Sequence, residues 1–363
     1  MKILLLNWRD LKNPDAGGAE LYVHRLFTDL AEKGYDIDWF CSSFKNCNIK
    51  ESYDGINFIR RGTRVSVVFY AFFHYLFNKY DFVVEAYNGV PWGTPIYVRK
   101  KKMGIFFHRL GDVYIKELGS IVGGFSKFFE DNLMKLIYKR MKFVTISESS
   151  KKGMIEIGLK EKNISIINPG VDLAMFKRGR KTIIPTICSV GRLNEYKSID
   201  HLIKAMPLIL KKVKNASLLI AGRGYKEKEL KDLVNSLGLQ NNIKFLGFIS
   251  NESLSRLYNG SWVLVNTSMK EGWGLTAIDA AASGTAIINA DSPGLRETVL
   301  DNENGFLYKY GNIEELSEKI IKILTDSELR KKFEKKGIEF GKQFDWNRIN
   351  EKFFNLINNF INN

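Results

Sequence analysis

The chain of 363 residues is 45% hydrophobic and 26% charged, which is ordinary for a globular protein with a sizeable core, and its length favours two domains. Its 55 basic and 40 acidic residues give a net charge of +15, and its three cysteines lack the spacing of a metal site, so we expect free thiols in a reducing cytoplasm. The longest apolar run, at 65–77, is too short to span a bilayer and predicts a buried helix, and the apolar run after Lys2 is too short for a secretion signal.

The first part of the chain alternates strand and helix patterns. The apolar run at 2–8 predicts a strand buried on both faces, and residues 16–34 place apolar side chains at helical spacing up to a terminal glycine. A strand pattern returns at 35–41, and this order is typical of a parallel α/β sheet. Further short apolar runs, which we interpret as strands, follow at 81–87, 103–108 and 143–147.

The alternation restarts after a segment at 168–185 that is rich in Pro, Gly and charged residues, which we interpret as a linker. A buried strand is predicted at 186–191, and the helix after it contains Pro207, which should kink or split it. Later strands are predicted at 217–222, 242–248, 262–268 and 285–290.

We therefore expect an α/β protein with two doubly wound domains, at 1–175 and 176–344, and an amphipathic C-terminal helix at 345–363. Ligands of such folds bind outside the carboxyl ends of the strands, so a cleft between the two domains would hold the functional site.

Three short segments place candidate groups at the predicted ends of strands. In AGGAE at 16–20, Gly17 and Gly18 would let a ligand approach the helix start, whose free N–H groups favour an anion, although a tight turn would also explain them. In GRLNEYKSID, the cations Arg192 and Lys197 suit a diphosphate, with solvated surface charges as the alternative. His108 ends an apolar strand, either as a polar group at a ligand cleft or as a core histidine whose hydrogen bonds are satisfied.

Two acids bracket a glycine-rich helix start in EGWGLTAIDAAASG at 271–284. Glu271 would lie on a loop, Gly272 and Gly274 would let the backbone turn tightly, and the helix would begin near Leu275 with its N–H groups open to an anion. Asp279 would lie about one turn into this helix. Small residues follow at 280–283, and we expect them to let the helix pack close to the sheet.

Taken together, these segments resemble the retaining glycosyltransferases of family 4, also called group 1, which have the GT-B fold. The matching pieces occur in the family's order and span most of the chain. They are GGAE at 17–20, TISESS at 145–150, NPGVD at 168–172, GRLNEYKS at 191–198, LLIAGRG at 218–224, EGWGLTAIDAAASG at 271–284 and SPGLRETV at 292–299. The resemblance implies two Rossmann-like, doubly wound parallel-sheet domains facing a central cleft. It also implies that the first domain binds the acceptor and that the C-terminal helix crosses back to it.

The resemblance further implies roles in binding a nucleotide-diphosphate sugar. The implied donor-binding residues are Gly17, Gly18, Arg192, Lys197, Glu271, Gly272, Trp273, Gly274, Leu275 and Asp279. The implied catalytic residues are His108, Arg192, Lys197 and Glu271. Arg192 and Lys197 would hold the diphosphate, and Glu271 would contact the donor sugar. His108 would stand near that sugar.

Asp279 departs from the family's usual glutamate, which binds the ribose hydroxyls. Its side chain is shorter by one methylene, so its carboxylate should lie about 1.5 Å further back. The ribose contact would then run through water, or the helix would pack closer. The family needs no metal and no cofactor beyond the nucleotide sugar as co-substrate, and here Arg192, Lys197 and helix N-termini could neutralise the leaving diphosphate.

The activity that this resemblance implies is transfer of a hexosyl group to the hydroxyl of a glycan, lipid-linked or small-molecule acceptor, with retention of anomeric configuration. A nucleotide-sugar epimerase of GT-B fold shares the same plan and would need no acceptor. A glycoside hydrolase would use Glu271 and Asp279 as acid and nucleophile, but it would explain neither the cationic pair nor the glycine loop.

Residues 99–162 hold 15 basic and 7 acidic residues, a balance that attracts nucleic acid or anionic lipid but also suits a solvated surface. The segment has no recognised nucleic-acid-binding motif, so we expect no nucleic acid as partner. Within it, residues 121–143 interleave bulky apolar and basic side chains, as in a helix lying on anionic lipid, with a core helix as the alternative. The apolar members are Phe125, Phe128, Phe129, Leu133, Leu136 and Ile137. We interpret the protein as cytoplasmic, with peripheral membrane contact through this patch.

Overall fold

The computed structural model describes residues 1–88, 91–109, 111, 113–115 and 119–362, and the chain divides into two compact units. The first unit comprises Met1–Ile115, Gly119–Pro169 and Trp346–Asn363, and the second contains Gly170–Asp345. Residues 170–175, which we expected in the first domain, lie in the second unit because the Val171 N–H donates to the carbonyl of Phe344 at 2.7 Å.

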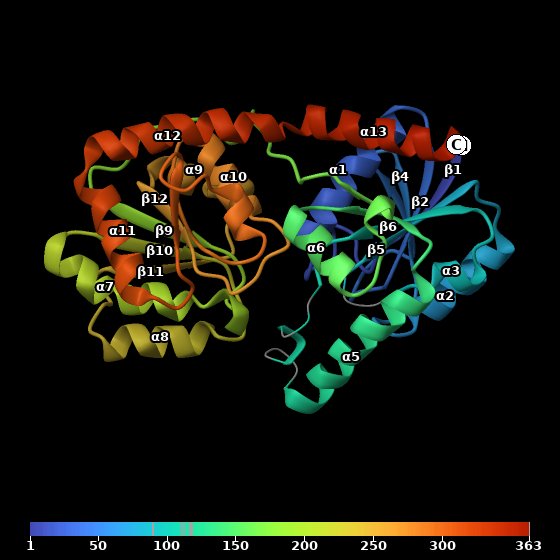
Figure 1. Ribbon diagram of the computed structural model, residues 1–363, viewed down its shortest axis with the longest axis horizontal. Helices are drawn as coiled ribbons and strands as arrows, with labels where there is room; N and C mark the ends of the chain where they lie inside the picture. Colours follow the sequence, from blue (N-terminus) through green and yellow to red (C-terminus); the bar gives the residue numbers. More distant parts are fainter. Residues whose placement is uncertain (89–90, 110, 112, 116–118, 363) are drawn as a thin grey trace. The chain divides into compact units, whose positions relative to one another are not determined.

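The first unit is built on an eight-stranded sheet in the order β3-β4-β2-β1-β5-β6-β7-β8 (Figure 1). All neighbouring strands are parallel except β3 and β4. Its strands are β1 (Lys2–Leu6), β2 (Asp36–Cys41), β3 (Lys50–Tyr53), β4 (Ile56–Arg60), β5 (Phe82–Tyr87), β6 (Lys101–Phe106), β7 (Lys142–Thr145) and β8 (Ile164–Ile166). The sheet grows outward in both directions from β1 and β5, as a doubly wound fold requires.

The C-terminal helix belongs to the first unit, as predicted. The described helices of the first unit are α1 (Gly18–Glu32), α2 (Val67–Phe77), α3 (Thr94–Tyr97), α5 (Ser120–Ile137), α6 (Glu148–Glu156) and α13 (Trp346–Asn362), with a 3-10 turn at Glu161–Asn163. The ring of Phe353 in α13 lies 5.8 Å from that of Phe27 in α1, and the Phe360 ring lies 5.7 Å from that of Phe82 in β5. Burial of the apolar face of α13 therefore ties the chain's end to its beginning.

Helix α2 is not the buried helix that its apolar sequence predicts. Only Val67 and Ala71 are buried, while Phe69, Phe73 and Phe77 are exposed. Hydrophobicity alone does not distinguish a core helix from a helix with an uncovered apolar face. Because α2 has no polar face, apolar side chains are exposed on the side that does not pack on the core.

The second unit has six strands, all parallel, in the order β11-β10-β9-β12-β13-β14. They are β9 (Thr186–Val190), β10 (Ser217–Ala221), β11 (Ile243–Gly247), β12 (Val263–Asn266), β13 (Ala286–Ala290) and β14 (Gly305–Tyr308). Numbered within the unit this is 3-2-1-4-5-6, the strand order of Rossmann folds, so the predicted fold is confirmed.

Helices cover both faces of this second sheet (Figure 1). They are α7 (Ile199–Lys212), α8 (Glu227–Ser236), α9 (Asn251–Gly260), α10 (Leu275–Ala282), α11 (Ile313–Thr325) and α12 (Ser327–Gly341), with 3-10 turns at Glu195–Lys197, Leu295–Thr298 and Lys342–Phe344. We expected Pro207 to kink or split helix α7, and the helix is not split, because it runs through Pro207 without a break. Its buried face, which includes Leu202, Met206 and Ile209, holds the helix in place although proline removes one backbone donor.

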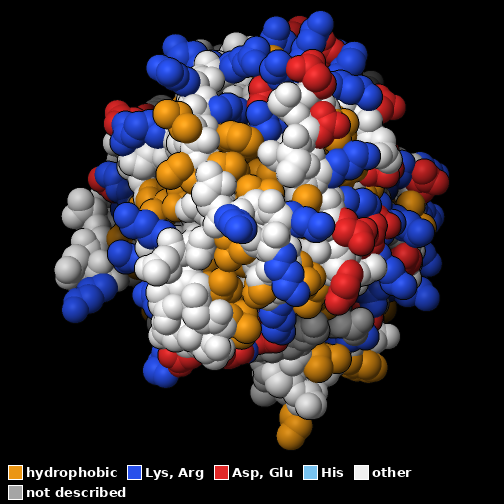
Figure 2. All heavy atoms as spheres, turned by 90° about the vertical axis from the view of Figure 1, so that its left-hand side faces the viewer, with side chains coloured by type: hydrophobic (Ala, Val, Ile, Leu, Met, Phe, Trp, Pro, Cys, Tyr) orange, Lys and Arg blue, Asp and Glu red, His pale blue; other side chains and the backbone are white. Residues whose placement is uncertain are grey.

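The surface is basic in many places. Figure 2 shows Lys and Arg side chains spread over the face that it draws, with Asp and Glu between them, so positive charge alone does not mark a site there. None of the helices that the structure describes is long and apolar enough to cross a membrane.

Candidate active site

The predicted donor residues of the second unit gather where its strand order reverses. Strands β9 and β12 are paired neighbours, but the chain runs from β9 toward one edge of the sheet and from β12 toward the other. The segments that leave their carboxyl ends carry Arg192 and Lys197 in one case and Glu271 in the other. Such a reversal leaves a crevice between the two diverging connections, which is where doubly wound folds bind ligands.

Lys197 and Glu271 are joined directly. The Lys197 ammonium donates a hydrogen bond to Oε1 of Glu271, and the Ser268 hydroxyl donates to the same oxygen at 2.7 Å. Thr267 fixes the backbone of this pair, because its hydroxyl donates to the Lys197 carbonyl at 2.8 Å. The side chains of Lys197 and Glu271 are only 16% and 21% exposed, so the ion pair is partly shielded from water.

The pairing keeps Lys197 charged. Burial alone would lower the pKa of its ammonium, but the Glu271 carboxylate outweighs burial and raises that pKa above its usual value. The nearby charge of Arg192 acts on the same pKa in the opposite direction. Arg192 is itself exposed, and within the described part of the chain no carboxylate forms an ion pair with it. A cationic Lys197 and an exposed Arg192 can together attract an anion.

Glycines that the sequence analysis did not single out shape this site. A Cβ at Gly294 would lie 2.3 Å from the Glu271 carbonyl oxygen, and φ is +82° there. The Glu271 N–H donates to the Pro293 carbonyl at 3.0 Å, so the 292–295 segment packs against the glutamate's backbone. Only glycine fits at this position. The sole signal in the sequence was its place in the motif SPGLRETV.

A second close approach joins the loop after β10 to the loop after β9. A Cβ at Gly222 would lie 1.8 Å from the Gly191 carbonyl oxygen, and one at Gly224 would lie 2.3 Å from that of Leu193. These two glycines therefore let the loop that carries Arg192 rest on its neighbour.

Helix α10 begins at Leu275, where the sequence predicts it. Gly274 precedes it as the N-cap, and a Cβ there would lie 2.7 Å from the Thr298 hydroxyl oxygen. Gly272 is buried beside it. Trp273 is buried as well, with its ring 5.3 Å from that of Phe344, so its side chain packs within the second unit. Of the predicted donor residues here, Trp273 can therefore offer only its backbone.

Asp279 lies half-buried in α10; its carbonyl accepts from the Ser283 hydroxyl at 2.9 Å, while its carboxylate accepts no hydrogen bond from the described residues. Burial raises the pKa of its carboxyl well above the usual range, and the Asp172 carboxylate adds to that rise. Burial and then the Asp279 charge raise the pKa of Tyr258 well above its usual value. The Tyr258 hydroxyl has no hydrogen-bond partner in the described structure. Glu271 is held by Lys197 and Ser268, whereas Asp279 lies on helix α10.

The small residues of α10 face another helix. A Cβ added to Gly341 of α12 would lie 3.2 Å from the Cα of Ala282, and one added to Gly337 would lie 3.6 Å from that of Ala281. The small residues of α10 thus allow a close approach to α12, and α10 also contacts β12 and β13 of the sheet. Because the backbones of α10 and α12 lie so close together, α10 has little room to shift.

The two predicted glycines of the first unit stand at the start of α1. Gly18 is its first residue, and the Gly17 N–H donates to the side chain of Glu20 at 2.8 Å. Glu20 is buried and paired with Arg9 at 3.1 Å. One of the N–H groups that we expected to face an anion is therefore already bound within the helix start.

His108 lies half-buried just beyond β6, between two anchored residues. The Phe107 carbonyl accepts a hydrogen bond from the Ser150 hydroxyl at 2.6 Å, and Arg109 binds Asp131 of α5 through two bonds of 2.9 and 2.8 Å. The backbone that carries His108 is therefore fixed on both sides. His108 belongs to the first unit with Gly17 and Gly18, and the other predicted site residues belong to the second.

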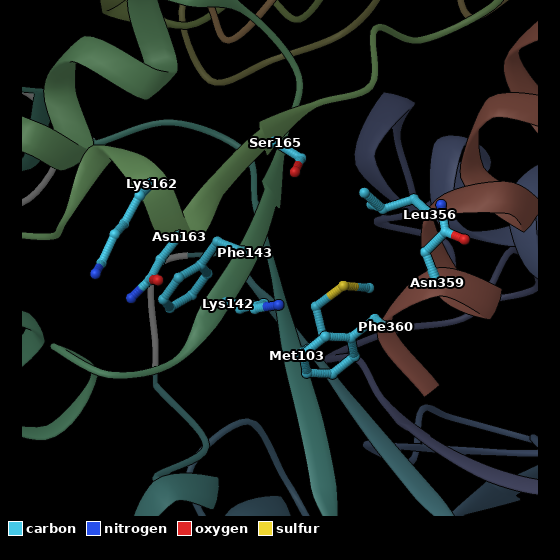
Figure 3. Close-up of a pocket in the computed structure, with 9 residues that line it drawn as sticks. All are labelled: Met103, Lys142, Phe143, Lys162, Asn163, Ser165, Leu356, Asn359 and Phe360. Atoms are coloured by element: carbon cyan, nitrogen blue, oxygen red, sulfur yellow. The ribbon is translucent and has the colours of Figure 1, made fainter. Parts of the chain in front are cut away.

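A pocket of about 160 Å³ lies elsewhere in the first unit, where β6, β7 and β8 meet α13 (Figure 3). Lys142 and Lys162 stand among its lining residues, and Leu356 and Phe360 reach it from α13. It contains none of the predicted site residues. Among the described residues, no group of three His, Cys, Asp or Glu side chains is placed to hold a metal ion.

Two family models match the chain in succession. Residues 16–175 match the one described as glycosyltransferase family 4, and residues 172–340 match the one described as glycosyl transferases group 1. The chain belongs to the family 4 glycosyltransferases. The resemblance drawn from its motifs is thereby confirmed.

Known proteins are similar to this glycosyltransferase over its whole length. It is 26% identical to an uncharacterised glycosyltransferase of Methanocaldococcus jannaschii, over 99% of this chain and 100% of the relative. The solved structure of sucrose-phosphate synthase from Thermosynechococcus elongatus superposes with a TM-score of 0.86 at 23% identity, covering 99% of this chain and 98% of that one. HepE of Anabaena, solved in complex with UDP-glucose, gives a TM-score of 0.80 at 18% identity and covers 99% and 100%. These structures show that the fold is shared.

Proposed function

We propose that this glycosyltransferase moves a hexosyl group from a nucleotide-diphosphate sugar to an acceptor hydroxyl, with retention of anomeric configuration. The observation that carries the proposal is the Lys197–Glu271 pair, held beside the exposed Arg192 at the point where the second sheet's strand order reverses. The complex of HepE with UDP-glucose, on the same fold, supports a donor of this class.

In this proposal each group of the site binds a different part of the donor. Arg192, Lys197 and the N–H groups at the start of α10 bind the diphosphate. Glu271 accepts hydrogen bonds from hydroxyls of the sugar. Asp279 accepts them from the ribose, through water where its shorter side chain falls short.

The proposed reaction breaks one bond and forms another on the same face of the sugar. The acceptor oxygen bonds to the anomeric carbon as the bond from that carbon to the diphosphate oxygen breaks. The acceptor's proton passes to the departing diphosphate. Arg192 and Lys197 stabilise the negative charge that develops on the leaving group, which is the main contribution to rate and requires no metal. His108 and the start of α1 act on the sugar in this proposal.

We propose a glycan or lipid-linked acceptor and a cytoplasmic location with peripheral membrane contact. The support comes from α5, where Ile121, Phe125, Phe128 and Leu136 are exposed while Met134 faces the core. Lys135, Lys139 and Arg140 are exposed beside them. The side chains of Phe129 and Leu133, which belonged to the predicted apolar face, lie outside the described residues. An exposed apolar face with basic neighbours suits an anionic lipid surface.

A panel of nucleotide sugars tests the donor assignment. The expected result is a rise in melting temperature with one nucleoside class, because a ligand that binds only the folded state stabilises it. NMR of the product made from that donor then reports the anomeric configuration. Conversion of the donor without any acceptor would identify an epimerase instead, and inverted product would overturn retention.

A further inference from the structure

Helix α2 carries an uncovered row of large apolar side chains. Phe69, Phe73, Leu76 and Phe77 are 67%, 53%, 54% and 81% exposed. Their spacing of four, seven and eight residues from Phe69 places them on one face of the helix. Single exposed apolar residues are common on protein surfaces, but an aligned row of this kind indicates an interaction site.

The rest of α2 is firmly seated, so the row is not exposed by loose packing. Val67 and Ala71 are buried in the core of the first unit. Phe72 and Tyr75 rest against Tyr97 of α3, with ring centroids 5.2 and 5.8 Å apart. Figure 1 shows α2 and α3 together in the first unit. The helix therefore presents its aromatic row from a fixed base.

The sequence segments that flank this row contain basic residues and no acidic residues. No Asp or Glu occurs in 61–80 or in 86–111. Arg61 and Arg64 precede the helix, and Lys79 follows it; all three are exposed. The Arg99 N–H donates to the Tyr75 hydroxyl at 3.3 Å, which places a further basic segment beside α2.

We infer that the Phe69–Phe77 face of α2 inserts into the surface of an anionic lipid bilayer. Aromatic side chains enter the boundary between headgroups and acyl chains, and a rim of Lys and Arg binds the anionic headgroups. An anionic bilayer matches both the aromatic row and the basic residues around it. The inference adds a second surface to the one proposed on α5 and does not depend on the identity of the donor.

The test is cosedimentation of the full chain with vesicles made from equal parts of phosphatidylglycerol and phosphatidylcholine. We expect Phe69→Ser/Phe73→Ser/Phe77→Ser to weaken binding by at least about tenfold, since three inserted rings are lost. The matched control is Ile49→Ser/Ile183→Ser, which removes two exposed apolar side chains elsewhere and should bind as the wild type does. Vesicles of phosphatidylcholine alone should bind the wild type weakly.

A second variant tests the basic rim. Lys79→Glu/Arg99→Glu should weaken binding to the phosphatidylglycerol vesicles by about fivefold per neutralised cation, or about 1 kcal/mol each, and by more for reversal. Because all these residues are exposed, unchanged melting temperatures should show that each variant is folded. The inference is overturned if the aromatic variant binds like the wild type or if the wild type ignores anionic vesicles. It is also overturned if the wild type is a dimer that the aromatic variant converts to a monomer.

Discussion

Lys197 and Glu271 lie 74 residues apart in the sequence, yet the lysine's ammonium donates a hydrogen bond to the glutamate's Oε1. Each comes from a different strand end at the centre of the second sheet. In the proposed complex one of these groups serves the diphosphate and the other the sugar. The ion pair thus holds both groups at the crevice before the donor arrives, which lowers the cost of ordering them on binding.

Replacement of Glu271 by glutamine tests the role of this pair. The amide oxygen can still accept from Lys197 and Ser268, so the local structure should survive, but the negative charge is lost. We expect kcat/KM to fall about 100-fold with little change in melting temperature. Glu315→Gln is the matched control, because it removes the charge from an ion pair with Lys319 on the surface of the same unit. Equal activities of the two variants would argue against a role for Glu271.

Gly294 tests how tightly the site's backbone is packed. Alanine there should lower stability by about 2 kcal/mol more than Gly311→Ala does. Both positions have nearly the same positive φ, +82° and +84°, so an alanine side chain is strained at both. Only at Gly294 would the new Cβ meet the Glu271 carbonyl oxygen. Urea unfolding gives the difference, and a loss of transfer in Gly294→Ala alone would show that the collision also displaces Glu271.

Asp279 provides a prediction about pH. Its pKa is raised in the folded state, so ionisation of this carboxyl opposes folding. The contribution of this carboxyl to the free energy of unfolding is therefore most favourable in acid, below the pKa that the carboxyl has in the unfolded chain. That contribution is lost as the pH rises through the pKa of the folded state. We expect Asp279→Asn to be more stable than the wild type at pH 8 and to lose that advantage near pH 4.

Melting temperatures of the two proteins between pH 4 and pH 8 check this prediction. Asp232→Asn, at an exposed carboxylate that pairs with Lys228, is the control and should show no such trend. A constant difference between wild type and Asp279→Asn across this range would contradict the prediction. Weaker donor binding by the more stable variant would further support a role in holding the ribose.

The sequence was sufficient to predict the two αβ repeats, the start of α10 at Leu275 and the return of the last helix to the first unit. The first two features depend on local periodicity and on glycine positions, which a single chain displays directly, whereas the third was implied by the resemblance to the family. The Lys197–Glu271 bond could not be predicted, because charge patterns place both residues at strand ends without showing which groups meet. The same limit explains α2: its hydrophobic run indicated burial, and only the fold shows that Phe69 and Phe77 are left uncovered. The collision that requires glycine at 294 likewise arises between segments that are distant in the chain.

The central claim is that a nucleotide-diphosphate sugar binds through its diphosphate at Arg192, beside the Lys197–Glu271 pair. The most direct test is to titrate the preferred nucleotide sugar into the wild type and into Arg192→Ala and to measure the dissociation constant and the rate of transfer. Arg256→Ala, which removes an exposed arginine elsewhere in the second unit, is the control. We predict that Arg192→Ala lowers kcat/KM by about 100-fold, because a charge-assisted contact to the leaving diphosphate is lost. Binding and transfer rates equal to those of the wild type would contradict the claim.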